Sequence, residues 1–204
     1  MPGKKASEEQ RREQILDAAL KVAAKERLEG VTVRRVAAEA GLSSGLVFFH
    51  FESKDALLVA LLDWLVEALV ARVRDVQLPE GTPRERFLEL VRQRITALPD
   101  ERDFVELFFD YWVMGTRHEA MHGKIRDALQ RYREAFRPLA EELLASEPER
   151  FPGVTADGLA GVAVSFIQGC AVQAAMDLDQ FDVDQFMRTL QALLVRTGAP
   201  TRRR

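Results

Sequence analysis

The spacing of apolar residues is helical almost throughout this chain. Apolar side chains recur at intervals of three and four, and no stretch shows the sustained alternation that indicates a strand. Breakers and capping residues separate these segments, as in TPRE at 82–85, a capping box with proline at the first helical position. The pattern predicts an all-α fold of about nine helices.

The N-terminal segment is divided into short helices. A first helix is expected from about Ser7 to Arg27, and Gly30 ends that unit. Thr32 then caps a short helix that ends at Gly41, and Ser43 opens a third. Six longer helices follow, with approximate bounds 53–77, 82–98, 100–115, 118–144, 156–177 and 183–195.

Composition and charge are those of an ordinary globular protein. Residues 1–55 hold ten Lys/Arg against nine Asp/Glu, and residues 56–204 hold nineteen against twenty-three, so positive charge gathers modestly at the N-terminus. This distribution permits a nucleic-acid partner. The polar start shows no secretory signal, and a single cysteine, Cys170, fits a reducing cytoplasm. The apolar stretch Leu159–Met176 is expected to be a buried helix, not a membrane span.

The second and third short helices have the residues that a helix-turn-helix requires. Ala37 provides the small side chain where the two helices cross, and Gly41 provides the positive φ of the turn four residues later. Val36, Leu42 and Val47 are expected to close the small core between these helices.

On these residues the chain resembles a known family. The stretch GVTVRRVAAEAGLSSGLVFFHFESKDALL is similar to the DNA-binding domain of TetR-type transcriptional repressors, over about residues 10–62, and FIQGCAVQAAMDLDQFDVDQF is similar to the choline-responsive BetI subgroup. The resemblance implies a homodimer that binds a palindromic double-stranded DNA operator and is released by a small-molecule inducer. The expected domains are a helix-turn-helix domain at 1–52 and a helical ligand-binding and dimerisation domain at 53–204.

The resemblance also implies which residues contact DNA. Hydroxyls and helix-start amides would hold phosphates or face base edges, and the phenylalanines stand where the family often has tyrosine and could pack on thymine methyls or sugar edges. Each polar residue also has a plain structural interpretation, as a helix cap or a solvated charge. Two adjacent phenylalanines on so short a helix cannot both be buried. The predicted DNA-binding residues are Thr32, Arg34, Ser43, Ser44, Gly45, Phe48, Phe49, His50 and Lys54.

The predicted helix at 100–115 carries Glu106 and Asp110 among five aromatic residues. Such a set is typical of a buried core or of a ligand pocket, and the acids favour the pocket because buried carboxylates need partners. A cationic or amphipathic ligand is one hypothesis, since aromatic faces suit quaternary ammonium, and a fatty acyl ligand is its rival. The predicted ligand-binding residues are Phe104, Glu106, Phe108, Asp110, Tyr111, Trp112 and Gln168.

The last two predicted helices carry a dimerisation pattern. Small residues spaced by four allow close helix approach, and an apolar seam follows on the last helix. Paired with a second copy, these helices would form a four-helix bundle; an ordinary monomer core is the alternative. The predicted interface residues are Gly161, Ser165, Gly169, Phe186, Leu190 and Leu194.

The stretch HEAMH, from His118 to His122, matches the H-E-x-x-H pattern of zinc hydrolases. A zinc enzyme of this type also needs a strand beside the motif, and the sequence predicts none. Glu141 and Glu142 lie at the sequence distance of a third ligand, but far along what the pattern predicts to be one helix. We therefore expect a regulator with no catalytic residues, metal or cofactor. A zinc hydrolase and a dimeric ligand-binding protein without DNA binding are the alternatives.

Overall fold

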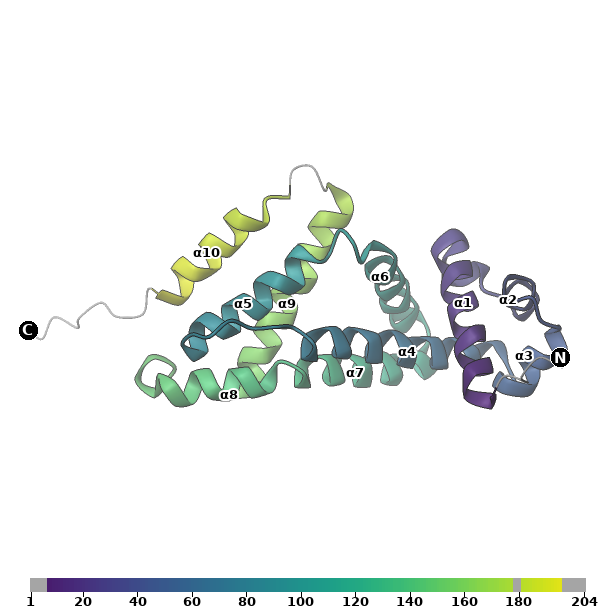
Figure 1. The fold of residues 1–204 in the computed structure, drawn as a ribbon, viewed down its shortest axis with the longest axis horizontal. Helices are drawn as coiled ribbons and strands as arrows, with labels where there is room; N and C mark the ends of the chain where they lie inside the picture. The colour runs from purple at the N-terminus through teal and green to yellow at the C-terminus, as the bar shows by residue number, and fades with distance from the viewer. Residues whose placement is uncertain (1–6, 178–180, 196–204) are drawn as a thin grey trace, which may run out of the picture. The chain divides into compact units, whose positions relative to one another are not determined.

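The computed structural model describes residues 7–177 and 181–195. All regular structure in these ranges is helical, which confirms the predicted all-α fold (Figure 1). Ten α-helices and one 3-10 turn are present among them: α1 (Glu8–Gly30), α2 (Val33–Ala40), α3 (Ser44–Phe51), α4 (Lys54–Arg74), α5 (Pro83–Thr96), α6 (Arg102–Arg117), α7 (Glu119–Glu134), α8 (Arg137–Ser146), η1 (Pro148–Arg150), α9 (Ala156–Met176) and α10 (Val183–Val195).

The additional helix comes from a break in the segment predicted as one helix over 118–144. α7 ends at Glu134 and α8 begins at Arg137, with Pro138 in its first turn. Proline is tolerated there, whereas inside a longer helix it would remove a backbone hydrogen bond and clash with the preceding turn. The prediction of a single helix was wrong, and Glu141 lies on a different helix from the HEAMH stretch.

Side-chain caps fix where several helices begin, as the sequence predicts. Ser7 and Thr82 each form a capping box with the residue three positions on. The hydroxyls of Thr32, Ser43 and Ser53 each accept a hydrogen bond from a backbone N–H three residues later. Each such bond satisfies an N–H that the helix start leaves without an intrahelical partner.

The chain folds into two compact units. The first comprises Met1–Ala68 and Asp103–Leu129, and the second comprises Leu69–Arg102 and Gln130–Arg204. This division follows compactness, so the functional division at 52/53 stays a prediction.

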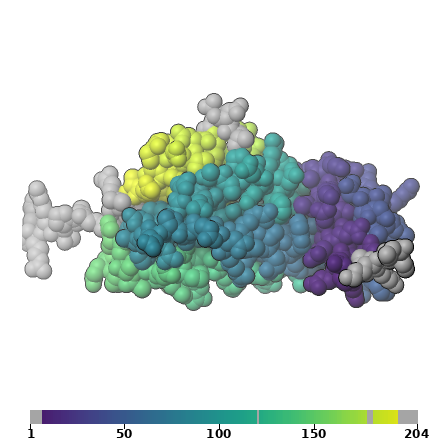
Figure 2. Space-filling view, viewed as in Figure 1, coloured from purple at the N-terminus to yellow at the C-terminus, as the bar shows by residue number. Residues whose placement is uncertain are grey.

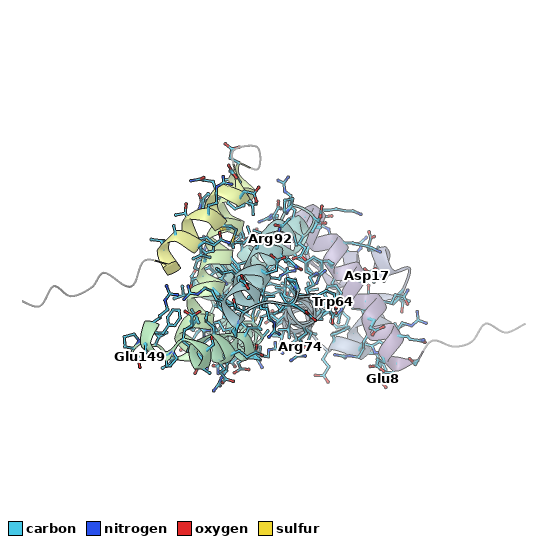
Figure 3. The ribbon with its side chains drawn as sticks, turned by 60° about the vertical axis from the view of Figure 1, so that its left-hand side comes forward. Glu8, Asp17, Trp64, Arg74, Arg92 and Glu149 are labelled. Carbon is cyan, nitrogen blue, oxygen red and sulfur yellow. The ribbon has the colours of Figure 1, made fainter. Side chains whose placement is uncertain are left out.

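The core of the first unit lies along α1 and α4. Ile15, Ala19 and Val22 of α1 are buried, and α1 packs against α2. On α4, a row of buried leucines continues this core, and Trp64 stacks on Phe104 of α6 with 5.9 Å between ring centroids (Figure 3). The helix-turn-helix segment therefore shares one unit with α6.

The core of the second unit lies where α5, α8 and α9 pack together. α9 buries eight residues, including Val164 and Ile167. This helix is also long and apolar enough to pass a composition test for a membrane span, a test that core helices of soluble proteins also pass. α10 lies along α5 (Figure 2), and Met187 of α10 is buried. The buried Arg94 is paired with Glu101, so its charge is compensated inside the unit.

Candidate nucleic-acid interface

The turn between α2 and α3 has the geometry that the sequence predicts. Ala37 is buried, and Gly41 adopts a left-handed conformation with φ 66°. The Leu42 N–H donates to the Ala37 carbonyl at 2.8 Å, which closes the end of α2. Because only glycine adopts this conformation without strain, the turn sets the direction in which α3 leaves α2.

Two side chains of α1 hold the far ends of α2 and α3. The Arg12 guanidinium donates to the His50 carbonyl at 2.6 Å and lies 4.4 Å above the Phe51 ring. The Gln14 amide donates to the Ala40 carbonyl at 2.8 Å. Sequence reasoning missed both residues, because their partners lie 38 and 26 positions away and no local pattern indicates such pairs.

α3 presents an apolar face to solvent. Val47 and Phe51 are buried against the rest of the unit, whereas Phe48 is 49% exposed and Phe49 is 75% exposed. Gly45, one turn earlier, is also exposed. The prediction that the two adjacent phenylalanines cannot both be buried is confirmed.

The polar residues predicted to contact DNA lie around this helix. Thr32 and Ser43 act as N-caps, and Arg34 is exposed on α2. The Lys54 ammonium, at the start of α4, lies 3.4 Å from the Glu29 carbonyl. DNA contact by these residues stays a prediction, and a capping role does not prevent it because the capped helix ends still face outward.

Ser44 and His50 complete the predicted set on α3, and both are half-buried. Among the described residues, Nδ1 of His50 is buried without a hydrogen-bond partner. The His50 ring also meets the Phe49 ring edge-on, with 5.2 Å between centroids. His50 therefore supports Phe49 from inside the unit.

The two acids predicted on the ligand helix both bind α1. The Arg27 guanidinium donates to Glu106 at 2.7 Å and to Asp110 at 2.5 Å, and the Leu28 N–H donates to Asp110 at 3.3 Å. Arg27 itself has φ 62°, a conformation that is costly for a residue with a Cβ. The partner that these carboxylates need is thus supplied within the protein.

The aromatic residues of α6 differ in their surroundings. Tyr111 is fully buried, its hydroxyl donates to the Leu58 carbonyl at 2.7 Å, and burial raises the pKa of Tyr111 well above its usual value. Phe104 and Phe108 are half-buried, whereas Trp112 is exposed. Gln168 lies half-buried on α9 in the second unit. Ligand contact by all of these residues stays a prediction.

The predicted dimerisation ridge lies on an uncovered face of α9. Ser165 and Gly169 are exposed, Gly161 is half-buried, and a Cβ added at Gly169 would meet no atom within 4 Å. On α10, Phe186 and Leu190 are half-buried, and the side chain of Leu194 lies outside the described part. Packing among the residues that the structure describes therefore does not explain the small side chains at Ser165 and Gly169.

The HEAMH stretch lies at the junction of α6 and α7. His118 separates the two helices, His122 is in the first turn of α7, and both side chains are exposed. Glu141 and Glu142 bind Arg137 and Arg86. Within residues 7–177 and 181–195, no group of three or more metal-ligating side chains could hold a metal ion.

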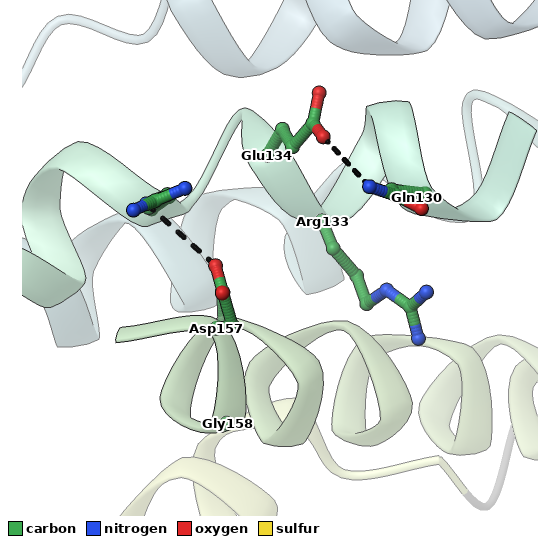
Figure 4. Close-up of a pocket in the computed structure, with 7 residues that line it drawn as sticks. Gln130, Arg133, Glu134, Asp157 and Gly158 are labelled. Carbon is green, nitrogen blue, oxygen red and sulfur yellow. Dashed lines mark hydrogen bonds and ion pairs between the residues drawn. The ribbon is translucent and has the colours of Figure 1, made fainter. Parts of the chain in front are cut away.

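A polar groove of about 410 Å³ opens in the second unit (Figure 4). Several of its polar groups bind one another: the Gln130 amide donates to Glu134 at 3.1 Å, and Arg137 forms an ion pair with Asp157 at 3.6 Å. Arg133 extends along the start of α9. The lining lacks the apolar walls of a small-molecule pocket.

Comparison with known proteins identifies the class to which these features belong: helix-turn-helix DNA-binding transcriptional regulators. Residues 15–61 match the family described as bacterial regulatory proteins, tetR family, and residues 83–199 match the BetI-type transcriptional repressor, C-terminal family. The chain belongs to the TetR family, with a C-terminal part of BetI type. This confirms the resemblance seen in the sequence.

Relatives and solved structures agree with this assignment. The chain is 30% identical over 168 residues to a helix-turn-helix regulator of Xanthobacter autotrophicus encoded in the dhlA 5′ region, covering 79% of this chain and 78% of the relative. It is 26% identical over 190 residues to the regulator BetI of Cronobacter sakazakii, covering 91% and 89%.

Two solved structures share the fold at low sequence identity. A transcriptional regulator from Pseudomonas aeruginosa has a TM-score of 0.78 at 20% identity, covering 92% of this chain and 90% of that one. A regulator from Saccharomonospora viridis, solved in complex with choline, has a TM-score of 0.69 at 21% identity, covering 93% and 97%.

Proposed function

We propose that this regulator is a cytoplasmic, homodimeric repressor that leaves its operator when a small molecule binds. The observation that carries the proposal is the α2–Gly41–α3 arrangement, which presents Gly45, Phe48 and Phe49 outward on one helix. An α-helix of this kind fits the major groove of B-DNA, where base edges are accessible.

DNA contact is divided between positioning and sequence readout. Arg34 and Lys54 would hold phosphates on either side of α3, with Thr32, Ser43 and His50 adding contacts at helix ends. Ser44, Gly45, Phe48 and Phe49 would face the bases. Phosphate contacts fix the register of the protein, whereas contacts to base edges determine which sequence is bound.

A palindromic operator requires two copies of this unit. The exposed ridge of α9 and the apolar side of α10 supply a self-complementary surface on which a second copy would form a four-helix bundle. The dimer would then present two α3 helices to successive major grooves, about 34 Å apart or at a multiple of that distance.

Release would act through α6, because α6 is tied directly to the DNA-binding segment. Arg27 joins the end of α1 to Glu106 and Asp110, so a ligand that moves α6 disturbs these bonds. The ligand must favour the arrangement that does not bind DNA. Aromatic rings such as Trp112 suit a quaternary ammonium group, and the choline complex of the Saccharomonospora viridis protein makes choline the first ligand to test.

The proposal is tested by titrating selected duplexes with purified protein over a range of salt concentrations. Specific binding should weaken steeply with salt, because phosphate contacts release counterions. Lys54→Ala should weaken binding to all duplexes alike and reduce the magnitude of the salt slope by about 1. Equal, weak binding of selected and random duplexes at every salt concentration would refute DNA regulation.

Ligand release is tested by repeating the operator titration with choline and, separately, with a fatty acyl-CoA. The effective ligand should lower operator affinity. Trp112→Ala on α6 should abolish that response. His118→Ala and His122→Ala, at the junction of α6 and α7, should change the response less. Identical responses of the wild type and Trp112→Ala would place the ligand site elsewhere. Peptidase activity that a chelator removes would instead support the zinc-hydrolase alternative.

A further inference from the structure

The outward face of α3 carries a glycine and two aromatic rings. Gly45, Phe48 and Phe49 are spaced by three and four, so they lie on one side of the helix. About half of Phe48 and three quarters of Phe49 are exposed to solvent. On the opposite side, Val47 and Phe51 already complete the contact with the core. Packing inside the unit therefore does not explain the two rings.

Gly45 is likewise not explained by the fold of this chain. A Cβ built at Gly45 would meet only the Ser43 hydroxyl, at 4.0 Å, so the interior leaves room for a larger residue. The absence of a side chain instead lowers this part of the helix surface and lets another molecule approach the backbone. A low point followed by two protruding rings is a shape complementary to a grooved partner.

This face offers few groups that read bases by hydrogen bonding. Between Ser44 and Phe51, the only side chains with hydrogen-bonding atoms are Ser44 and His50. His50 has its Nδ1 buried and its ring against Phe49. α3 contains no arginine, lysine, asparagine or glutamine, the residues that most often make bidentate bonds to guanine or adenine.

The major groove has one apolar group at a base edge that varies with sequence, the 5-methyl group of thymine. We propose that Phe48 and Phe49 select the operator by packing on thymine 5-methyl groups, so that methyl content, more than hydrogen-bonding pattern, determines sequence choice under α3. This inference rests on the proposed DNA-binding function and names the chemical feature that the function recognises. A 5-methylcytosine presents the same methyl group and would substitute for thymine where base pairing is preserved.

The test begins with operators selected from random duplexes by the wild-type protein. Each half-site thymine is then replaced by deoxyuridine, which keeps every hydrogen-bonding atom and removes only the methyl group. Loss of one buried methyl is expected to lower affinity about fourfold, and the symmetric change in both half-sites about fifteenfold. Half-sites without thymine, or affinities unchanged at every replaced position, would overturn the proposal.

A double-mutant cycle shows whether the rings are responsible for this loss. In Phe49→Ala and Phe48→Ala, the thymine and deoxyuridine operators should bind equally at the position that each ring contacts, whereas Phe49→Leu should keep part of the preference. Val154→Ala truncates another exposed apolar side chain outside α3 and is the matched control. An undiminished preference for thymine in both alanine variants would contradict the role of the rings.

Loss of DNA regulation and loss of methyl readout would give different experimental results. If selection yields no preferred duplex, DNA regulation itself is wrong. If a preferred operator binds well but ignores the thymine methyl groups, DNA binding stands and only the mode of readout is wrong. Because the deoxyuridine scan uses wild-type protein, it does not depend on the folding of any variant.

Discussion

α3 and α9 both leave apolar surface uncovered, but they do so with different side chains. α3 is an eight-residue helix whose uncovered surface is two protruding aromatic rings, Phe48 and Phe49. α9 has 21 residues, and its uncovered surface is a ridge of small residues flanked by Val162 and Val172. Protruding rings suit a partner with a groove, whereas a low ridge suits the close approach of another helix.

The two helices are also held in place differently. α9 buries eight residues, so apolar packing is the main contribution to its position. α3 buries only Val47 and Phe51, and its orientation depends further on the Gly41 turn and on Arg12. A large buried face thus supports the helix of the proposed subunit contact, whereas a few directional hydrogen bonds orient the helix of the proposed DNA contact.

The largest expected effect comes from blocking the α9 ridge. Gly169→Leu places a bulky side chain where two helices would meet in the proposed dimer, so the two copies should separate. Affinity for the palindrome should fall on the order of a hundredfold or more, because the second half-site no longer binds as part of the same molecule. Light scattering and operator titration measure the two effects. An unchanged dimer would place the subunit interface on another surface, and α9 would then have no role in it.

A smaller effect is expected from Phe49→Ala on α3. Operator affinity should fall on the order of tenfold, while the dimer and the thermal stability remain as in the wild type. Sedimentation, calorimetric melting and operator titration together separate these properties. If Phe49→Ala instead dissociated the dimer, the assignment of separate partners to α3 and α9 would be wrong.

Arg12→Ala should lower stability by about 2 kcal/mol, because it removes a charged hydrogen bond to the His50 carbonyl and a ring contact with Phe51. Operator affinity should fall together with stability, since the C-terminal end of α3 loses its bond to α1. Lys21→Ala, which removes only an exposed ion pair with Asp17 on the same helix, is the control and should change little. Equal urea denaturation curves for the two variants would contradict the role given to Arg12.

The smallest effect is a pH dependence confined to the unit that contains α9. The Arg84 guanidinium lowers the pKa of Glu147 to about 2. Because the folded-state pKa is depressed, the pair stabilises the protein fully above the unfolded pKa near 4.5, and this contribution is lost as pH falls toward 2. Glu147→Gln should flatten the stability profile in that range without affecting operator binding at neutral pH. An unaltered acid profile would show that the pair contributes nothing measurable.

Features encoded by local spacing could be predicted from the sequence. Thr82 and Glu85 predicted a helix start, and Ala37 with Gly41 predicted the turn, because a cap or a turn depends on residues within a few positions. The break before α8 also had a local signal, Pro138, which helical periodicity on both sides concealed. Periodicity reports which face is apolar and does not report where a helix is interrupted.

Contacts between distant helices could not be predicted in this way. Glu106 and Asp110 were predicted to need partners if buried; both are half-buried, and the sequence did not show that Arg27, about 80 positions earlier, would bind both. Arg27 also gave no local sign of its positive φ, since arginine is not typical there. Only the tertiary structure brings these groups together.

Cys170 makes the protein convenient for selective chemical labelling. It is the only cysteine in the sequence, it is buried, and burial raises the pKa of its thiol to about 11. At pH 7 only about one molecule in ten thousand would carry the reactive thiolate at this site. A cysteine introduced at an exposed position of α1, such as Glu9→Cys, would therefore react with a fluorophore while Cys170 stays almost unlabelled. Energy transfer between two labelled copies would then report the distance between their DNA-binding segments.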